Sequence, residues 1–226
     1  MRSFFCFLGM WAGFLLAPET QGQPNNFNHW LQYSGTYWVN PQWGLTAHLQ
    51  YRTYKPVTDL RVAFTGAEVQ QAFKDLPVLV AAGYSHLFNR NYLTPEETTY
   101  THENRLYQQI TVRGQVGSVG VSHRYQVEER WLPQGYHTRL RYLLGLRVPI
   151  KPDAEGETPW YGILRNEVRV IIRDQPFDSN RVYGGLGYVV NKHLTLEGMW
   201  MSQLVGTGKH QHFSVFVLRH DFGQME

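Results

Sequence analysis

Serine and histidine are the residue types in this chain that could carry out hydrolysis. Ser122 and His123 are neighbours. In an extended strand, neighbouring side chains point to opposite faces, so these two cannot act together as nucleophile and base. A pair on two adjacent strands, such as Ser202 with His212, stays open. We therefore expect no catalytic site and keep a lipid hydrolase as a weaker alternative.

Metal and nucleotide sites are weakly indicated. His210 and His212 could bind a metal from one face of a strand, but no acidic residue lies near them in the sequence. The glycines Gly184, Gly185 and Gly187 resemble a nucleotide loop only distantly, because no helical segment follows them. Close packing in a sheet wall explains these glycines better. We expect neither a metal nor a cofactor.

The most distinctive polar residues are nine arginines and three glutamates, which alternate with apolar residues along four consecutive segments. They are Glu103, Arg105, Arg113, Arg124, Glu128, Arg130, Arg139, Arg141, Arg147, Arg165, Glu167 and Arg169. Guanidinium groups are planar and always charged, so they suit a lattice of ion pairs. Inside a barrel, such a lattice would plug the lumen. Alternatively, the excess of arginine would make a narrow anion-preferring pore or an anion-binding lumen.

Eleven segments with period-two alternation must position these residues. They are Phe27–Val39, Trp43–Tyr54, Asp59–Val69, Leu76–Phe88, Thr98–Arg113, Ser118–Trp131, Thr138–Ile150, Trp160–Ile172, Asn180–Val190, His193–Leu204 and His212–Phe222. Strands of soluble proteins usually have about 5 to 6 residues, and membrane-spanning strands need about 9 to 11. The length of these segments therefore favours the wall of a membrane barrel.

Alternation alone does not say which face is inside. In a soluble lipocalin-like barrel, the apolar face would line a ligand cavity. In a membrane barrel, the apolar face would meet lipid. Aromatic residues near segment ends favour the membrane, as an interfacial girdle requires: Trp30, Tyr37, Trp38, Trp43, Tyr51, Tyr54, Trp131, Trp160 and Trp200.

The last segment carries Phe216, Leu218 and Phe222, which resemble the terminal signature by which outer-membrane barrels are inserted. We expect an all-β fold, a single up-and-down antiparallel transmembrane barrel. Because bacterial barrels normally have an even number of strands, we expect 10 or 12, with 12 preferred. The expected location is the bacterial outer membrane, and the expected partners are its lipid and the barrel-assembly machinery.

Composition bounds the remaining possibilities. The 226 residues carry a net charge of only +3, which argues against nucleic acid as a partner. An apolar run from Phe4 to Ala17 follows Arg2, which predicts a signal peptide over residues 1–22 and a barrel over residues 23–226. The single cysteine, Cys6, lies in the predicted signal peptide. Cysteine chemistry and disulfides are therefore excluded from the mature chain.

Several motifs together resemble a known family. They are His102–Gln109, Ser122–Arg130, Arg139–Tyr142, Asn166-Glu167 and Phe177–Tyr188, the last with the run Asn180-Arg181-Val182-Tyr183-Gly184. This series is similar to the barrels of domain-of-unknown-function family 2490, over about Asn28 to Phe222. The resemblance implies a signal-bearing β-barrel of the bacterial envelope. It implies no activity.

Overall fold

The computed structural model describes residues 27–94, 96–150, 158–172 and 176–224. The expected signal peptide, residues 1–22 with Cys6, lies outside these ranges. The described residues form eleven strands. They are β1 Phe27–Trp38, β2 Trp43–Thr53, β3 Leu60–Ala72, β4 Val78–Tyr92, β5 Thr98–Val116, β6 Val119–Leu132, β7 Gly135–Pro149, β8 Trp160–Ile171, β9 Phe177–Asn191, β10 Leu194–Val205 and β11 His210–Gly223.

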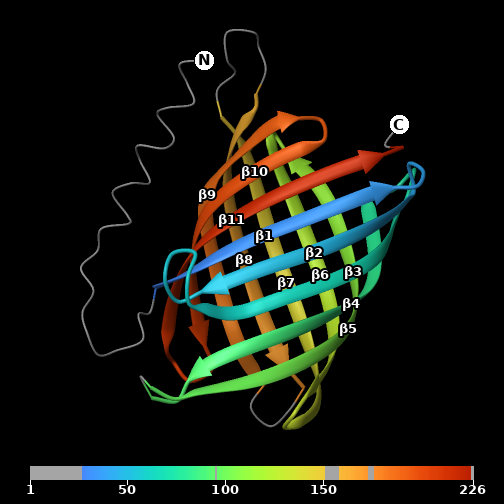
Figure 1. The fold of residues 1–226 in the computed structure, drawn as a ribbon. Helices are drawn as coiled ribbons and strands as arrows, with labels where there is room; N and C mark the ends of the chain where they lie inside the picture. The colour runs from blue at the N-terminus through green and yellow to red at the C-terminus, as the bar shows by residue number, and fades with distance from the viewer. Residues whose placement is uncertain (1–26, 95, 151–157, 173–175, 225–226) are drawn as a thin grey trace.

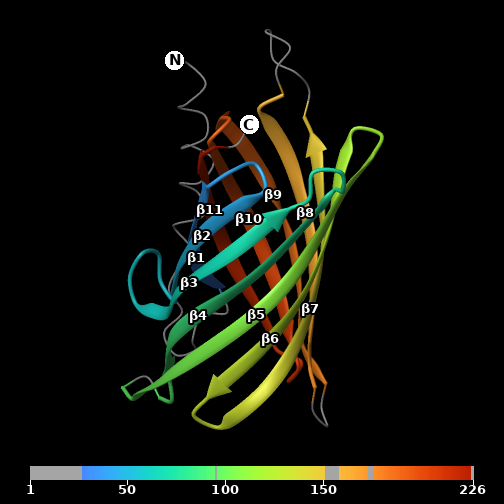
Figure 2. The same ribbon diagram turned by 90° about the vertical axis from the view of Figure 1, so that its right-hand side faces the viewer.

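The strands close into one barrel in which each pairs with its neighbours in the sequence (Figures 1 and 2). The closing pair is β1 with β11, and these two strands run parallel, with Phe27 opposite His212 and Trp38 opposite Gly223. The all-β barrel is thus confirmed. The expected strand number of 10 or 12 is wrong, and so is the expectation of a wholly antiparallel wall.

Odd closure has a simple geometric cause. Strand direction alternates along an up-and-down chain, so an eleventh strand runs the same way as the first. The two can therefore pair only in parallel, with a ladder slightly weaker per residue than an antiparallel one but without an open edge. All eleven segments expected from the sequence are strands, and the even strand number typical of bacterial barrels does not hold for this one. Five strands extend at least three residues beyond the expected bounds: β3 to Ala72, β4 to Tyr92, β5 to Val116, β7 from Gly135 and β9 from Phe177.

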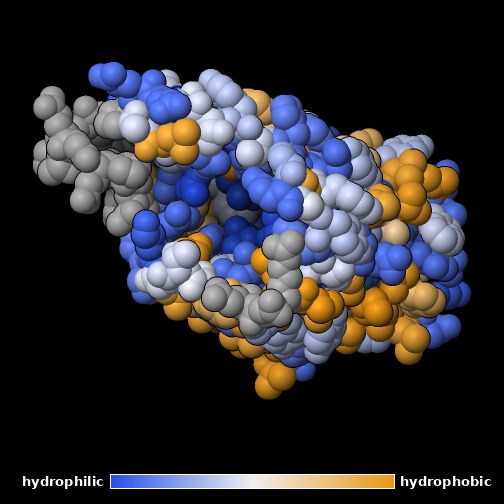
Figure 3. Space-filling view, turned by 90° about the horizontal axis from the view of Figure 1, so that it is seen from below, coloured by the Kyte–Doolittle hydropathy of each residue, from blue (hydrophilic) through white to orange (hydrophobic). Residues whose placement is uncertain are grey.

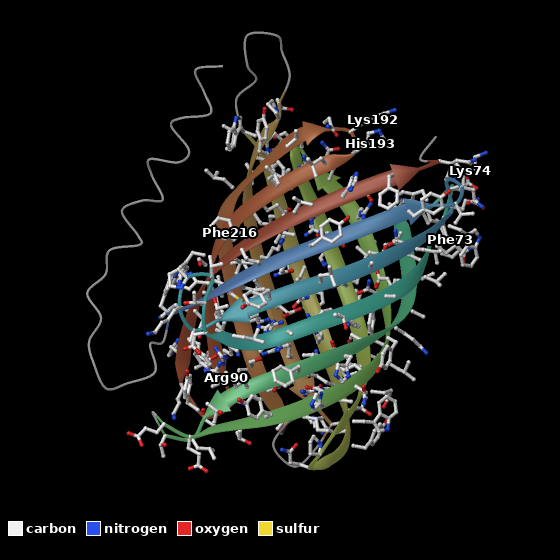
Figure 4. The ribbon with its side chains drawn as sticks, viewed as in Figure 1. Phe73, Lys74, Arg90, Lys192, His193 and Phe216 are labelled. Atoms are coloured by element: carbon white, nitrogen blue, oxygen red, sulfur yellow. The ribbon has the colours of Figure 1, made fainter. Side chains whose placement is uncertain are left out.

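The barrel has two rims. The N-terminal rim is the end at which β1 begins, and the C-terminal rim is the end at which β11 finishes. Short turns over 39–42, 73–77, 117–118 and 192–193 lie at the C-terminal rim. In Figure 4, the labelled turn residues Phe73, Lys74, Lys192 and His193 lie at this end and Arg90 lies near the other. The wall of the barrel thus begins at one rim and finishes at the opposite one.

The apolar face of the wall points outward. Leu140 is 42% exposed and Val148 is 38% exposed, and Leu144 shares their face. Glu128 and Glu167, on the opposite face, are each 1% exposed. Figure 3 shows a hollow lined mainly by hydrophilic residues, with hydrophobic residues gathered on the outer wall. The described residues contain no helix that is long and apolar enough to cross a membrane.

One side of the interior is nevertheless apolar. The inward side chains of β1 and β8 to β11 pack into an apolar inner wall: Trp30, Tyr161, Ile163, Tyr183, Met199, Met201, Phe213, Val215 and Val217. Trp30 is 4% exposed, and Trp38 lines the interior cavity. The expectation that these two tryptophans belong to an outer girdle is therefore wrong, because even-numbered residues of β1 face inward.

Two adjacent glycines in β9, Gly184 and Gly185, differ in how much space a side chain would have. A Cβ atom on Gly185 would press on the carbonyl oxygen of Gly198 and lie 2.7 Å from the Cα atom of Met199. A Cβ atom on Gly184 would meet only a Leu164 methyl group, at 3.9 Å. Gly185 therefore allows β9 and β10 to approach closely, which supports the expected role in wall packing for Gly185 but not for Gly184.

We expect Gly185→Ala to lower the free energy of unfolding by about 1 to 3 kcal/mol, because backbone atoms must shift to admit the methyl group. Gly184→Ala is the matched control and should leave stability nearly unchanged. Thermal unfolding in detergent, followed by circular dichroism, measures both. Equal stability of the two variants would contradict this account of the β9–β10 packing.

Candidate functional site

Five carboxylates inside the barrel are each shared by two or three arginines. Glu167 of β8 makes ion pairs with Arg124 and Arg181, at 3.3 Å each, and with Arg141. Glu128 of β6 accepts from Arg141 at 2.6 Å and from Arg139 at 2.8 Å. Arg141 therefore bridges the two glutamates across β6, β7 and β8. Such charge-assisted contacts are stronger than ordinary hydrogen bonds, which fixes these strands relative to one another.

Three further carboxylates repeat this arrangement around the interior. Glu103 lies between Arg105, at 2.6 Å, and Arg130.

Asp178 lies 3.3 Å from both Arg139 and Arg169. Glu197 accepts from Arg165 at 2.7 Å, from Arg219 at 3.3 Å and from the Tyr161 hydroxyl at 3.1 Å. We call these five carboxylates and their arginines the arginine lattice.

All twelve charged residues singled out in the sequence lie on the inward face. Ten of them take part in the arginine lattice, and the structure does not bring Arg113 and Arg147 into it. Arg113 is exposed and lines the interior cavity. The guanidinium of Arg147 lies 3.7 Å from the ring centroid of Tyr161. Within the described ranges, neither of these two makes an ion pair with a carboxylate.

Sequence reasoning missed several members of the interior. Arg52, Glu68, Arg181, Glu197 and Arg219 all follow the same alternation on strands to which it was not extended. Extending the period-two pattern to β2, β3, β9, β10 and β11 would have found them.

Two charged residues reach the interior through β-bulges. On β9, Ser179 pairs with Arg169 and Phe177 with Val170, which leaves Asp178 as the extra residue. On β3, Val62 pairs with Arg52 and Leu60 with Thr53, which leaves Arg61 as the extra residue. A bulge re-aims a side chain that alternation would send to the other face. No signal of period two could have placed Asp178 and Arg61 inside.

A second polar cluster lies on β1, β2 and β3. The Ser34 hydroxyl is 3.2 Å from Nδ1 of His48, and Nε2 of His48 is 3.4 Å from Glu68. Glu68 also accepts from the Tyr107 hydroxyl at 3.0 Å and from the Gln109 amide at 3.2 Å. This order of serine, histidine and carboxylate could activate a nucleophile. Sequence spacing does not reveal this cluster, because its three residues come from three different strands.

The two serine–histidine pairs considered in the sequence, Ser122 with His123 and Ser202 with His212, are not joined by hydrogen bonds between their side chains in the described residues. Ser122 donates to the Gly145 carbonyl at 3.4 Å, whereas the His123 ring bonds to the Tyr142 hydroxyl, on the other face. Ser202 lies opposite His212 in the ladder, but no hydrogen bond joins their side chains in the part of the chain that the structure describes. Among the described residues, no group of three or more His, Cys, Asp or Glu side chains could hold a metal ion.

The terminal residues of β11 face outward. Phe216 is 36% exposed and Phe222 is 38% exposed, and Leu218 lies between them on the same face (Figure 4 labels Phe216). The ring of Phe222 lies 5.6 Å from that of Tyr37, next to it at the C-terminal rim. Their role in membrane insertion stays a prediction.

We expect Glu167→Gln to lower the free energy of unfolding by about 3 to 5 kcal/mol, because it leaves buried guanidinium groups facing one another without their shared carboxylate. Glu97→Gln, in an exposed turn, is the control and should change little. Thermal unfolding of both variants in detergent measures the difference. A barrel that loses no stability with Glu167→Gln would show that the lattice does not hold these strands.

Comparison with known proteins completes the description of the site. No curated protein and no solved structure matches the chain significantly. The family model described as a protein of unknown function (DUF2490) matches residues 27–213, which include β1 to β10 and the first four residues of β11. The resemblance seen in the sequence motifs is therefore confirmed, and the chain belongs to the DUF2490 family.

Proposed function

We propose that this protein is a β-barrel of the bacterial outer membrane, with its apolar face in lipid and its arginine lattice in the lumen. One observation carries this proposal, the outward exposure of large apolar side chains all round the wall. Leu49, Leu106 and Leu164 are 51%, 51% and 54% exposed. A continuous apolar surface of this kind is unfavourable in water and is what a lipid-facing band requires.

The two rims support the same placement. Tyr37, Trp43 and Phe222 are exposed on the outer face near the C-terminal rim, and Trp131 and Tyr136 near the N-terminal rim. Aromatic rings prefer the membrane interface. The mostly short turns of the C-terminal rim are typical of the periplasmic side of outer-membrane barrels.

The lumen itself we propose to be a structural plug or a narrow anion-preferring pore, without a catalytic site or a cofactor. The arginine lattice crosses the interior, and its arginines outnumber their carboxylates. Positive charge of this kind favours anions over cations in a pore. A soluble lipocalin-like barrel is less well supported, because charged side chains occupy much of the interior that an apolar ligand would need.

Outer-membrane lipid and the barrel-assembly machinery are the proposed partners, the second through Phe216, Leu218 and Phe222 of β11. Nucleic acid is not proposed, since the net charge is only +3 and the arginines are turned inward.

Cell fractionation and planar-bilayer recording test the proposal together. We expect the protein in the outer-membrane fraction, with a gel mobility that changes on heating. If the lumen conducts, the current should be small and carried mainly by anions, because the lattice is positive. Glu167→Gln should then increase the preference for anions, and Glu97→Gln should not.

A soluble periplasmic protein would overturn the membrane placement. A large current that prefers cations would overturn the proposed lumen. A heat-modifiable barrel without current would identify the lattice as a plug.

A hydrolase is the second candidate function, and the cluster of Ser34, His48 and Glu68 favours it. In this function Ser34 would be the nucleophile and His48 the general base, oriented by Glu68. All three line the interior cavity, so a substrate would have to enter the lumen.

A fluorophosphonate probe tests this candidate directly. In a hydrolase, the Ser34 oxygen forms a bond to phosphorus, fluoride leaves, and His48 takes the serine proton. Labelling of the wild type that disappears in Ser34→Ala and weakens strongly in His48→Gln would establish the nucleophile. We expect no labelling if the lumen is a plug or a pore, with Ser122→Ala as the matched serine control.

A further inference from the structure

We infer that the lumen contains a binding site for the head of a small organic anion, centred on Arg52 of β2. The head is a carboxylate or a phosphate ester group, and the apolar inner wall accommodates the body. This inference goes beyond the proposed function. It requires that a solute reaches the lumen from one rim, but neither conduction nor a particular location in the cell.

Arg52 is held in place by Trp30 rather than by a carboxylate. The two residues face each other across β1 and β2, and the guanidinium lies 3.8 Å from the centroid of the indole ring. One of its nitrogens donates to the Gln50 amide oxygen at 2.8 Å. Stacking on an aromatic face orients a guanidinium without neutralising it. The planar fork is therefore fixed without a carboxylate partner.

Donor atoms at this point lack acceptors. The Nε atom of Arg52 and the Nε1 atom of Trp30 are both buried without a hydrogen-bond partner. Trp30 as a whole is 4% exposed. A buried donor without an acceptor costs about 1 to 3 kcal/mol, and more when the group is charged. An oxyanion within reach of these donors would remove that cost.

The charged groups that act most strongly on Arg52 are cations, namely Arg181, Arg105 and Arg61. Arg105 has Glu103 as its partner, and Arg181 has Glu167. In the described part of the chain, no carboxylate lies within ion-pair distance of Arg52 or Arg61.

Arg61 reaches this region from the β3 bulge and donates to Gln211 at 3.3 Å. Its guanidinium lies 5.4 Å from the ring of Tyr54, in the β2–β3 turn. Burial raises the pKa of Tyr54, so its hydroxyl stays neutral and supplies no negative charge. The region around Arg52 thus keeps an excess of positive charge that the arginine lattice does not neutralise.

An adjoining cavity gives a ligand room. It has a volume of about 460 Å³, within the range of small-molecule sites. Arg52, Arg105 and Arg124 line it from β2, β5 and β6, and Met199, Val217 and Tyr183 line it from the apolar inner wall. Arg165 and Arg219 also line it, and both are paired with Glu197. The carboxylates that also line it, Glu68, Glu128 and Glu167, already have hydrogen-bond partners in the protein. The cavity thus offers an unpaired guanidinium and apolar side chains together, which fits a ligand with a charged head and an apolar body. A bare ion would use only the guanidinium.

Isothermal titration of the purified, detergent-solubilised barrel tests the site. Phenyl phosphate and inorganic phosphate are titrated separately at equal ionic strength. We expect saturable binding of phenyl phosphate and weaker binding of inorganic phosphate. Arg52→Met should weaken the binding of phenyl phosphate about tenfold or more, because it removes a charge-assisted contact. Arg90→Met removes the same charge from the outer face and should change the dissociation constant less than about twofold.

Each outcome decides one part of the inference. No saturable binding of either probe, or equal binding by Arg52→Met and wild type, overturns the site. Equal affinity for the two probes overturns the apolar part and leaves an oxyanion site. If Arg52→Met does not fold, Arg52→Lys is used, which keeps the charge but loses the fork and should also weaken binding. A barrel that fractionates with the outer membrane but binds neither probe would contradict this inference and leave the proposed membrane placement intact.

Discussion

Sharing of each carboxylate of the arginine lattice among two or three arginines is the interaction on which the interior depends. Glu167 alone meets arginines from β6, β7 and β9, so one side chain links β8 to its two neighbours and to a strand further along the wall. Burying a charge is costly unless it is paired, so these contacts tolerate little displacement. A one-residue slip of any of these strands would turn its charges outward and its apolar residues inward. The lattice therefore fixes the register of the wall as well as the charge of the lumen.

The interior is divided, and the division explains how a narrow barrel stays filled. Strands β5 to β8 contribute most of the arginine lattice, whereas β1 and β8 to β11 contribute the apolar inner wall. Tyr161 belongs to both, because its ring packs with the apolar residues and its hydroxyl donates to Glu197. Trp30 packs against Phe213 and stacks on Arg52, an interior arginine outside the lattice. Aromatic residues with one polar atom thus connect the apolar inner wall to charged residues of the interior.

Much of this architecture is readable from the sequence. Period-two alternation placed the eleven strands and the twelve charged residues of the middle segments on the correct face, because a strand has only two faces. Alternation cannot reveal bulges, so Asp178 and Arg61 were out of reach. Alternation also cannot predict which side chains of different strands meet. The contacts among Ser34, His48 and Glu68 are therefore seen only in the structure. The predicted strand number was wrong for a different reason. It rested on the even number that is usual in other barrels and not on the residues of this chain.

The parallel closure of β1 on β11 also decides how the barrel would respond to mechanical force. β1 begins with Phe27 at one rim, and the adjacent strand β11 ends with Gly223 at the opposite rim. A force that draws these two residues apart pulls β1 and β11 in opposite directions along their length. The load then falls on all hydrogen bonds of this ladder together, in shear. In a barrel with an even number of strands, both ends lie at one rim, and the same force would open the seam one bond at a time.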